Sequence, residues 1–347
     1  MTPSHRRITL KDLAARLEVS TATVSNAFNR PDQLSPALRD RILSEARDVG
    51  YVGPDARGRS LRTGRSKIIA VVLADSLTYS LNDAVASEFL AGVSEVLDEH
   101  GHTLLLLPSR QGMRLESASM ADGFIVYGLL PDPQMHEQLS QQRPLMAVDF
   151  DIAGHASVHI DNHAACLNIA RHALRRRPRR PAIINLRSTA EPCNGRIIDQ
   201  PLFSESQTIT RARLNGFYEA LAEHDFVPAD VPMWNIEENT HDVCSPVIAE
   251  ILDLPDGERP DLMLCMSDRI ALTVLTLAEQ RGLRIPEDLR MTGFDGIAEG
   301  QYRAPRLTTV RQDSVAKGRL AASMVLGRTA MESHCLTTHL IVGETAP

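Results

Sequence analysis

The 347-residue sequence lacks the features that define secreted, membrane-spanning and zinc-binding proteins. Its five cysteines lie far apart with no Cys-x-x-Cys pair, which argues against a disulfide framework or a zinc site and predicts reduced, mostly structural thiols. No segment joins a charged start, an apolar run and a small-residue cleavage site, and no run of about 18 apolar residues occurs. These absences predict a cytoplasmic protein without a membrane segment.

Motifs of common enzyme classes are also missing. There is no Gly-x-Gly-x-x-Gly after the first apolar strand, no phosphate-binding Gly-Lys-Ser/Thr loop and no Gly-x-Ser-x-Gly elbow. His155, His159 and His163 are spaced by four, but a strand-like segment at 158–160 lies among them, which argues against a shared helical face and a metal site. We therefore expect no enzyme activity, no cofactor and no metal.

Charge is unevenly distributed along the chain. The formal net charge is −7, yet residues 1–66 hold 12 Lys and Arg against 7 Asp and Glu, a net charge of +5, and the remainder holds 25 against 37, a net charge of −12. A basic first segment on an acidic body suits phosphate binding at one end. The alternative is that these basic residues form an ordinary solvated face.

Three short helices are predicted in the first 50 residues. The first starts at Thr9 and presents Leu10, Leu13, Ala14 and Leu17 on one face. Two residues later Ser20 caps a second helix that ends at Asn29; its apolar stripe is Val24, Ala27 and Phe28, and its polar face is Thr21, Ala22, Thr23, Ser25 and Asn26. Ser35 and Pro36 start the third helix, which stops at Gly50. Two short helices so tightly joined form a helix-turn-helix, whose second helix binds DNA.

From residue 67 onward, apolar strands alternate with helices. The predicted strands are 68–73, 103–107, 123–127, 145–148, 182–186, 233–236, 262–266 and 289–293, and the predicted helices are 82–100, 133–142, 162–175, 211–224, 242–253 and 268–281. Two such series predict an α/β bilobed fold of two doubly wound parallel sheets, with a ligand cleft beyond the carboxyl ends of the strands. Residues 188–208 are predicted to be a polar loop.

Several stretches resemble the lac-repressor (LacI/GalR) family of bacterial transcription regulators. They are Ile8–Ala14, Val19–Ser20, Thr23–Ser25, Asn29, Gly50–Tyr51 and Ser60–Gly64 in the first segment, and Ser267–Leu272, Gly282–Asp288, Gly293–Gly296 and Leu307–Asp313 later. The resemblance implies a helix-turn-helix headpiece at 1–52, a hinge at 53–66 and a periplasmic-binding-protein-like effector domain at 67–347. Its N-lobe would span about 67–160 and 313–333, and its C-lobe about 161–312 and 334–347.

The resemblance also implies which residues contact DNA. Direct base contacts fall to Thr21, Ala22 and Asn26, where many family members have arginine in place of Asn26; the alternative for Asn26 is a solvent-facing helix residue. The resemblance assigns phosphate contacts to Thr9, Ser20, Thr23, Ser25, Asn29, Ser35 and Arg39. The alternative for any of the hydroxyls is a role as a helix cap. The hinge residues assigned to the minor groove are Arg57, Gly58 and Leu61, and Leu61 matches the leucine that is inserted between base steps. Since glycine costs a helix about 1 kcal/mol, we expect the free hinge to fold only on DNA.

For the effector, the resemblance points to residues that would line the cleft: Leu77, Tyr79, Asp149, Arg213, Asp268, Asp295 and Gln312. Carboxylates and arginine can bind adjacent hydroxyls, so a sugar or related metabolite is the expected ligand. The alternatives are a helix N-cap for Asp268 and a strand-end surface charge for Asp149.

These features together predict a sequence-specific DNA-binding repressor that binds a palindromic operator and responds to a small molecule. Because no heptad repeat follows the last family-like stretch, we expect a homodimer rather than a tetramer. Two alternatives are a solute-binding receptor and a sugar-binding α/β protein or enzyme fused to a DNA-binding domain.

Overall fold

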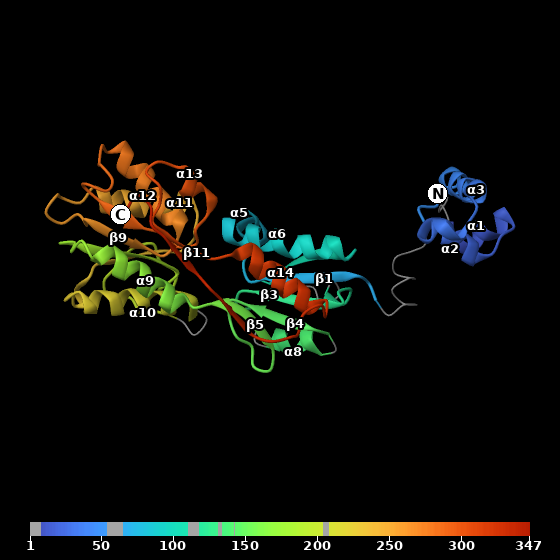
Figure 1. Ribbon diagram of the computed structural model, residues 1–347, viewed down its shortest axis with the longest axis horizontal. Helices are drawn as coiled ribbons and strands as arrows, with labels where there is room; N and C mark the ends of the chain where they lie inside the picture. The colour runs from blue at the N-terminus through green and yellow to red at the C-terminus, as the bar shows by residue number, and fades with distance from the viewer. Residues whose placement is uncertain (1–7, 54–64, 110–117, 131–133, 142, 204–207) are drawn as a thin grey trace, which may run out of the picture. The chain divides into compact units, whose positions relative to one another are not determined.

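The computed structural model describes residues 8–53, 65–109, 118–130, 134–141, 143–203 and 208–347 (Figure 1). They fall into two compact units, Met1–Lys67 and Ile68–Pro347. Within the described ranges, no helix has the length and apolar character needed to cross a membrane. We call the first unit the headpiece and the second the two-lobed unit.

The headpiece consists of three helices around one small core. These are α1 (Leu10–Leu17), α2 (Thr21–Asn29) and α3 (Pro36–Asp48), with the 3-10 turn η1 (Pro31–Gln33) between the last two. Each helix begins at the predicted cap: Thr9 forms a capping box with Asp12, Ser20 caps α2 and Ser35 caps α3. The side chains of the core are those with the predicted helical spacing, closed by Tyr51: Leu13, Ala14, Leu17, Val24, Ala27, Ile42 and Ala46.

In its described residues the two-lobed unit contains two large sheets and a two-stranded pair. The first has the order β12-β5-β4-β3-β1-β2, all parallel, and is built from β1 (Ile68–Leu73), β2 (Thr103–Pro108), β3 (Gly123–Tyr127), β4 (Leu145–Val148), β5 (Ala156–Ile160) and β12 (His334–Leu336). The second has the order β10-β9-β6-β8-β7, from β6 (Pro181–Leu186), β7 (Gly195–Ile197), β8 (Met233–Ile236), β9 (Leu262–Cys265) and β10 (Arg290–Thr292). The predicted fold class, a helical headpiece with a bilobed α/β domain, is confirmed.

Helices cover both sheets, and α6 and α14 lie side by side on the first (Figure 1). The helices are α5 (Leu77–Asn82), α6 (Ala84–Glu99), α8 (Gln134–Ser140), α9 (Asn162–Leu174), α10 (Thr208–Glu223), α11 (His241–Leu252), α12 (Asp268–Gln280), α13 (Ala298–Tyr302) and α14 (Ser314–Val325), with a 3-10 turn η2 (Pro228–Asp230). A Cβ added at Gly92 of α6 or Gly318 of α14 would collide with the backbone of the other helix, so these glycines set the close approach.

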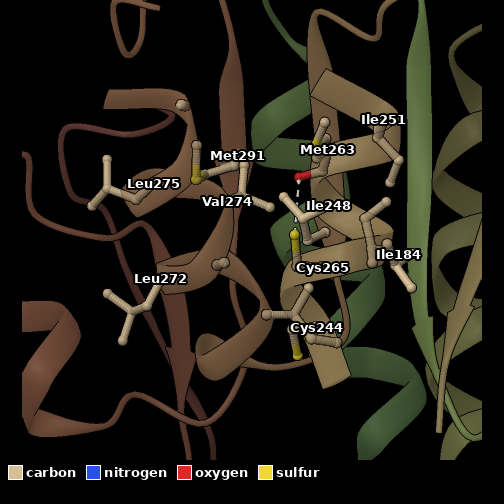
Figure 2. Close-up of a cluster of buried hydrophobic side chains, with 14 of the residues drawn as sticks. Ile184, Cys244, Ile248, Ile251, Met263, Cys265, Leu272, Val274, Leu275 and Met291 are labelled. Atoms are coloured by element: carbon tan, nitrogen blue, oxygen red, sulfur yellow. Dashed lines mark hydrogen bonds between the residues drawn. The ribbon is translucent and has the colours of Figure 1, made fainter. Parts of the chain in front are cut away.

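The interior of the second lobe is apolar. Figure 2 shows the cluster that joins the sheet to α11 and α12, with Cys244 and Cys265 among its aliphatic side chains. All five cysteines are unpaired, and burial raises the pKa of the Cys244 thiol to about 12. Cys244 is therefore a protonated thiol with a structural role in the core.

Several details differ from the sequence-based expectation. No helix or strand was predicted after residue 293, where the structure has α13, β11 (Thr309–Arg311), α14, β12 and β13 (His339–Ile341). The predicted loop at 188–208 contains a short edge strand, β7, antiparallel to β8. The first lobe extends further along the chain than 333, because β12 pairs with β5 in the first sheet. The chain then enters the two-stranded pair of β11 and β13. Helix α5 follows β1 where no helix was expected.

Candidate functional site

Helix α2 presents a polar face to solvent. Thr21 and Ala22 are exposed and Asn26 is half-exposed, whereas Val24 and Ala27 are buried in the headpiece core. The three residues predicted to contact bases therefore lie on the outward side of the helix, with small side chains that allow the backbone to approach a groove.

Most residues predicted to contact phosphates already make local hydrogen bonds. The Ser20 hydroxyl accepts from the Thr23 amide at 3.0 Å, and the Ser35 hydroxyl accepts from the Leu38 amide at 3.4 Å. Further along, Asn29 Nδ2 donates to the Ser25 carbonyl at 2.9 Å, and Arg39 Nε donates to the Ala27 carbonyl at 3.3 Å. Thr9 caps α1 in the same way. Capping fixes Thr9, Ser20 and Ser35 at helix N-termini, where a phosphate oxygen can also be bound. The predicted hinge residues Arg57, Gly58 and Leu61 lie outside the described residues.

A cavity of about 430 Å³ lies between the two lobes. Five of the seven residues predicted to line it do so: Tyr79, Asp149, Arg213, Asp295 and Gln312. They come from the α5 region, the end of β4, helix α10 and the segments after β10 and β11. The carboxyl ends of both sheets therefore open onto one cavity, as the parallel topology requires.

A chain of polar contacts runs along this cavity from one lobe to the other. Buried Lys317 of α14 donates to Asp149 Oδ1 at 2.5 Å and to Gln312 Oε1 at 3.0 Å. Gln312 Nε2 in turn donates to Asp295 Oδ1 at 2.8 Å. On the far side, Arg213 approaches the same oxygen at 3.7 Å. Lys317 is only 1% exposed. Its buried ammonium group therefore joins the Asp149 carboxylate of the first lobe to the Gln312 side chain, which in turn contacts Asp295 of the second lobe.

The Arg213 guanidinium is held in place by the second lobe. Its Nε donates to Asn162 Oδ1 at 2.9 Å, its Nη1 donates to the Met266 carbonyl at 2.7 Å, and it lies 3.7 Å from the centre of the Phe294 ring. These contacts fix the plane of the guanidinium and leave its Nη2 directed toward Asp295.

Asp295 has an unusual protonation equilibrium. Burial raises its pKa from 3.8 to about 7; nearby Asp83 adds to this effect, whereas Arg213, Gln312 and Lys317 oppose it. The residue has a positive φ of 116°, and its backbone is held by Val310 and Gln312. The carboxyl group can thus act as a hydrogen-bond donor or acceptor near neutral pH.

Two predicted cleft residues lie elsewhere. Asp268 is fully buried behind the cavity, where it accepts from the Ile297 amide at 2.8 Å and from the Thr309 hydroxyl at 2.5 Å. It is not the N-cap of α12 either, because that role belongs to Ser267. Burial and the charge of Asp295 raise its pKa. Leu77 packs against the core of the first lobe instead of lining the cavity. Asp268 therefore braces the segment that follows Asp295, and Leu77 anchors α5.

A second connection between the lobes was not predicted from the sequence. Arg187, directly after β6, contacts both oxygens of Asp75, directly beyond β1, at 3.0 and 3.1 Å. Its guanidinium also lies 4.8 Å from the centre of the Tyr79 ring. Beside this pair, Asn239 donates to Asp83 at 3.3 Å. We call these five residues the inter-lobe contact. All of them line the cavity, and the position of Asp75 and Arg187 after parallel strands is the signal that could have identified them.

Across the described part of the chain, no three His, Cys, Asp or Glu side chains are grouped so as to hold a metal ion. The chemistry available at the cavity is therefore that of carboxylates, amides, arginine and tyrosine, which suits reversible binding of a polar molecule.

Comparison with known proteins identifies the family. Residues 9–53 match the model for bacterial regulatory proteins of the lacI family, and residues 201–346 match the periplasmic binding protein-like domain. A helix-turn-helix (HTH) type transcriptional regulator of Mycobacterium tuberculosis is 34% identical over all of this chain and 99% of its own length. The chain belongs to the LacI family. Another relative, the HTH-type transcriptional repressor CytR of Escherichia coli, is 30% identical over 92% of this chain and 89% of its own length.

Solved structures agree with this assignment. A LacI-family regulator from Corynebacterium glutamicum has a TM-score of 0.68 and 28% identity, covering 99% of this chain and all of its own. The complex of the regulator CelR with cellobiose has a TM-score of 0.65 at 24% identity over 98% of this chain and 100% of its own. The lac repressor dimer bound to operator and an anti-inducer has a TM-score of 0.71 at 19% identity over 98% of this chain and 99% of its own, and supports the fold. This LacI-family protein is therefore a transcription regulator, not an enzyme.

Proposed function

We propose that this regulator is a repressor that binds a palindromic operator as a homodimer and releases it when a sugar or related metabolite fills the cavity between the lobes. The observation that carries the proposal is the cavity itself: side chains of both lobes line one space of about 430 Å³. A molecule in that space contacts both lobes at once, so its binding energy depends on how the lobes are arranged.

The polar groups of the cavity suit a polyhydroxylated ligand. Asp83, Asp149 and Asp295 supply acceptors, and Arg213 supplies a fixed donor. Adjacent hydroxyls pair well with carboxylates and guanidinium groups, and Tyr79 offers an apolar ring face. A volume of about 430 Å³ is in the usual range for a small-molecule site. The cellobiose complex of a structural neighbour supports the same ligand class.

On the DNA side we assign base contacts to Thr21, Ala22 and Asn26 of α2. Phosphate contacts are assigned to Thr9, Ser20, Thr23, Ser25, Asn29, Ser35 and Arg39. The minor-groove contacts belong to the hinge, with Leu61 between base steps. Effector binding would change the arrangement of the lobes and lower operator affinity through a coupling of about 1 to 3 kcal/mol.

Selection of binding sites from random duplex DNA with full-length protein tests the first half of the proposal. We expect a palindromic winner whose affinity falls steeply with salt, and sedimentation should show dimers on it. Failure to enrich any sequence, or monomers at micromolar concentration in the presence of the selected DNA, would contradict the proposal.

A panel of neutral saccharides, starting with cellobiose, then tests the effector. At least one should lower the affinity for the selected DNA by about 5-fold or more, the smallest typical allosteric coupling. Asp295→Ala should abolish this response, whereas Asp256→Ala, an exposed carboxylate outside the cavity, should retain it. An unchanged response in Asp295→Ala would refute the assignment of the cavity as the effector site.

A further inference from the structure

Two carboxamides form a pair on the exposed side of the headpiece. Asn26 Nδ2, on the outward face of α2, donates to Gln33 Oε1 at 3.1 Å. Gln33 is the last residue of η1 and is exposed. The pair therefore joins the proposed recognition helix to the turn that follows it.

Resting on the proposed DNA binding, we propose that Gln33 is a positioning residue for base recognition: its carbonyl holds the Asn26 carboxamide in the orientation that contacts one base edge. Gln33 was not among the DNA-contacting residues predicted from the sequence. The proposal makes the specificity of Asn26 depend on a residue outside α2.

The hydrogen-bonding capacity of Asn26 is sufficient for both partners. An asparagine amide has two N–H groups and one carbonyl oxygen. Gln33 takes one N–H, which leaves one donor and one acceptor. An adenine edge in the major groove offers one acceptor, N7, and one donor, the N6 amino group. The pair with Gln33 thus uses only the group that adenine does not need.

Another asparagine of the same helix shows what an unassisted side chain does. Asn29 turns back along α2 and donates to the carbonyl and hydroxyl of Ser25, four residues earlier. Such local bonding to the i−4 carbonyl is the common alternative for asparagine in a helix. Asn26 does not make it, because its amide is directed toward Gln33 instead.

The turn that carries Gln33 is itself anchored. The Gln33 amide donates to the Arg30 carbonyl at 3.1 Å, and the Arg30 amide donates to the Asn26 carbonyl at 2.8 Å. Leu34, the next residue, packs against the headpiece core. Gln33 is therefore held at a fixed distance from Asn26 by backbone bonds, and its carboxamide can orient that of Asn26 before DNA is bound.

The test compares four full-length variants with the wild type: Gln33→Met, Gln33→Glu, Asn26→Ala and Asn26→Ala with Gln33→Met. Each is measured against the selected operator and against operators with every single base-pair change. Methionine keeps the length of the side chain without an acceptor, whereas glutamate keeps the acceptor and adds a negative charge. Because position 33 is exposed, melting curves should coincide and serve as the folding control.

We expect Asn26→Ala to lose about 10-fold of base preference at one symmetric operator position. Gln33→Met should lose most of the preference at that same position, and the double variant should lose no more than Asn26→Ala alone. Gln33→Glu should keep the preference but bind all sequences more weakly, with a changed salt dependence.

Three results would overturn the inference while leaving DNA binding intact. They are an unchanged preference in Gln33→Met, a sharper one, which would mean that Gln33 sequesters Asn26, and a loss at a position that Asn26→Ala does not affect. If the wild type enriches no sequence at all, the proposed function fails as well. Failure of the inference alone is therefore distinguished by DNA binding that remains intact.

Discussion

At the scale of single residues, the buried charges of the cavity determine how the two-lobed unit responds to pH. Asp295 has a pKa of about 7 in the folded protein, above the ordinary 3.8, because it is buried. Between pH 3.8 and about pH 7, the Asp295 carboxyl group therefore keeps its proton in the folded state but has lost it in the unfolded state. The stabilising contribution is complete below about pH 4 and disappears as the pH rises to about 7.

Asp295→Asn should remove this dependence. The substitution keeps an oxygen that accepts from Gln312 Nε2 but removes the titration. From pH 4 to pH 7 the wild type should lose free energy of unfolding relative to the variant, by at most about 4 kcal/mol for a pKa raised from 3.8 to about 7. Urea unfolding at several pH values measures it. Parallel curves for the two proteins would show that Asp295 does not titrate in this range.

The sequence identified part of the cavity and missed the rest for local reasons. Asp149 and Asp295 follow strands, which is a recognisable position, and the structure brings both to the cavity. Asp268 also follows a strand, but the Ser267 cap turns its side chain away from the cavity, toward Ile297. Lys317 lies inside a helix whose pattern does not distinguish a buried lysine from an exposed one. The sequence could therefore predict which residues follow a strand, but it could not predict the direction in which each side chain points.

At the scale of elements, the helices and central strands of this protein follow from local signals. Caps at Thr9, Ser20 and Ser35 fixed the starts of the first three helices, and apolar runs located β1, β3 and β4. Most of the elements that the sequence did not predict are short, with α14 of 12 residues as the exception, and the strands among them depend on neighbours far along the chain. Edge strand β7 needs β8, and β12 needs β5, which lies 176 residues earlier in the chain at their first pair, Val158 and His334.

Helix α2 allows its cap to be separated from its proposed phosphate contact. Ser20→Ala should destabilise the headpiece by about 1 kcal/mol, because the Thr23 amide loses its acceptor. Ser20→Asp should retain the stability, since aspartate is an equally good cap, but bind DNA more weakly through repulsion of phosphates. Thermal melting and operator titration measure the two effects. An Asp variant that binds as tightly as the wild type would exclude a phosphate at this helix end.

At the scale of the whole molecule, the first 66 residues differ in net charge from the remainder, and the two-lobed unit is divided into lobes that contact each other. The first 66 residues are basic and the remainder acidic, so only one end of the chain attracts DNA. Within the two-lobed unit, the lobes meet through polar side chains that line the cavity and through Ala84 and Val85 of α6, which pack against the core of the second lobe. A polar ligand can therefore compete for the polar part of the contact between the lobes.

Arg187→Gln should loosen the inter-lobe contact. It removes the pair with Asp75 and the contact with the Tyr79 ring, which should cost about 1 kcal/mol because Arg187 is partly exposed. Amide hydrogen exchange should rise in α5 and around Asn239. Arg177→Gln is the matched control, because Arg177 also has a positive φ but lies exposed in the second lobe. Equal exchange in both variants would contradict a role for Arg187 in holding the lobes together.

The path of the chain also determines when each part can fold during synthesis. The first lobe begins at β1, yet its helix α14 ends at Val325 and its strand β12 ends at Leu336. At about 5 to 20 residues per second, the ribosome needs more than ten seconds to supply those last elements after β1 has emerged. During that interval the strands that α14 covers lack this helix and the edge of β5 is unpaired, so the first lobe is exposed to pairing with other chains until its last elements arrive.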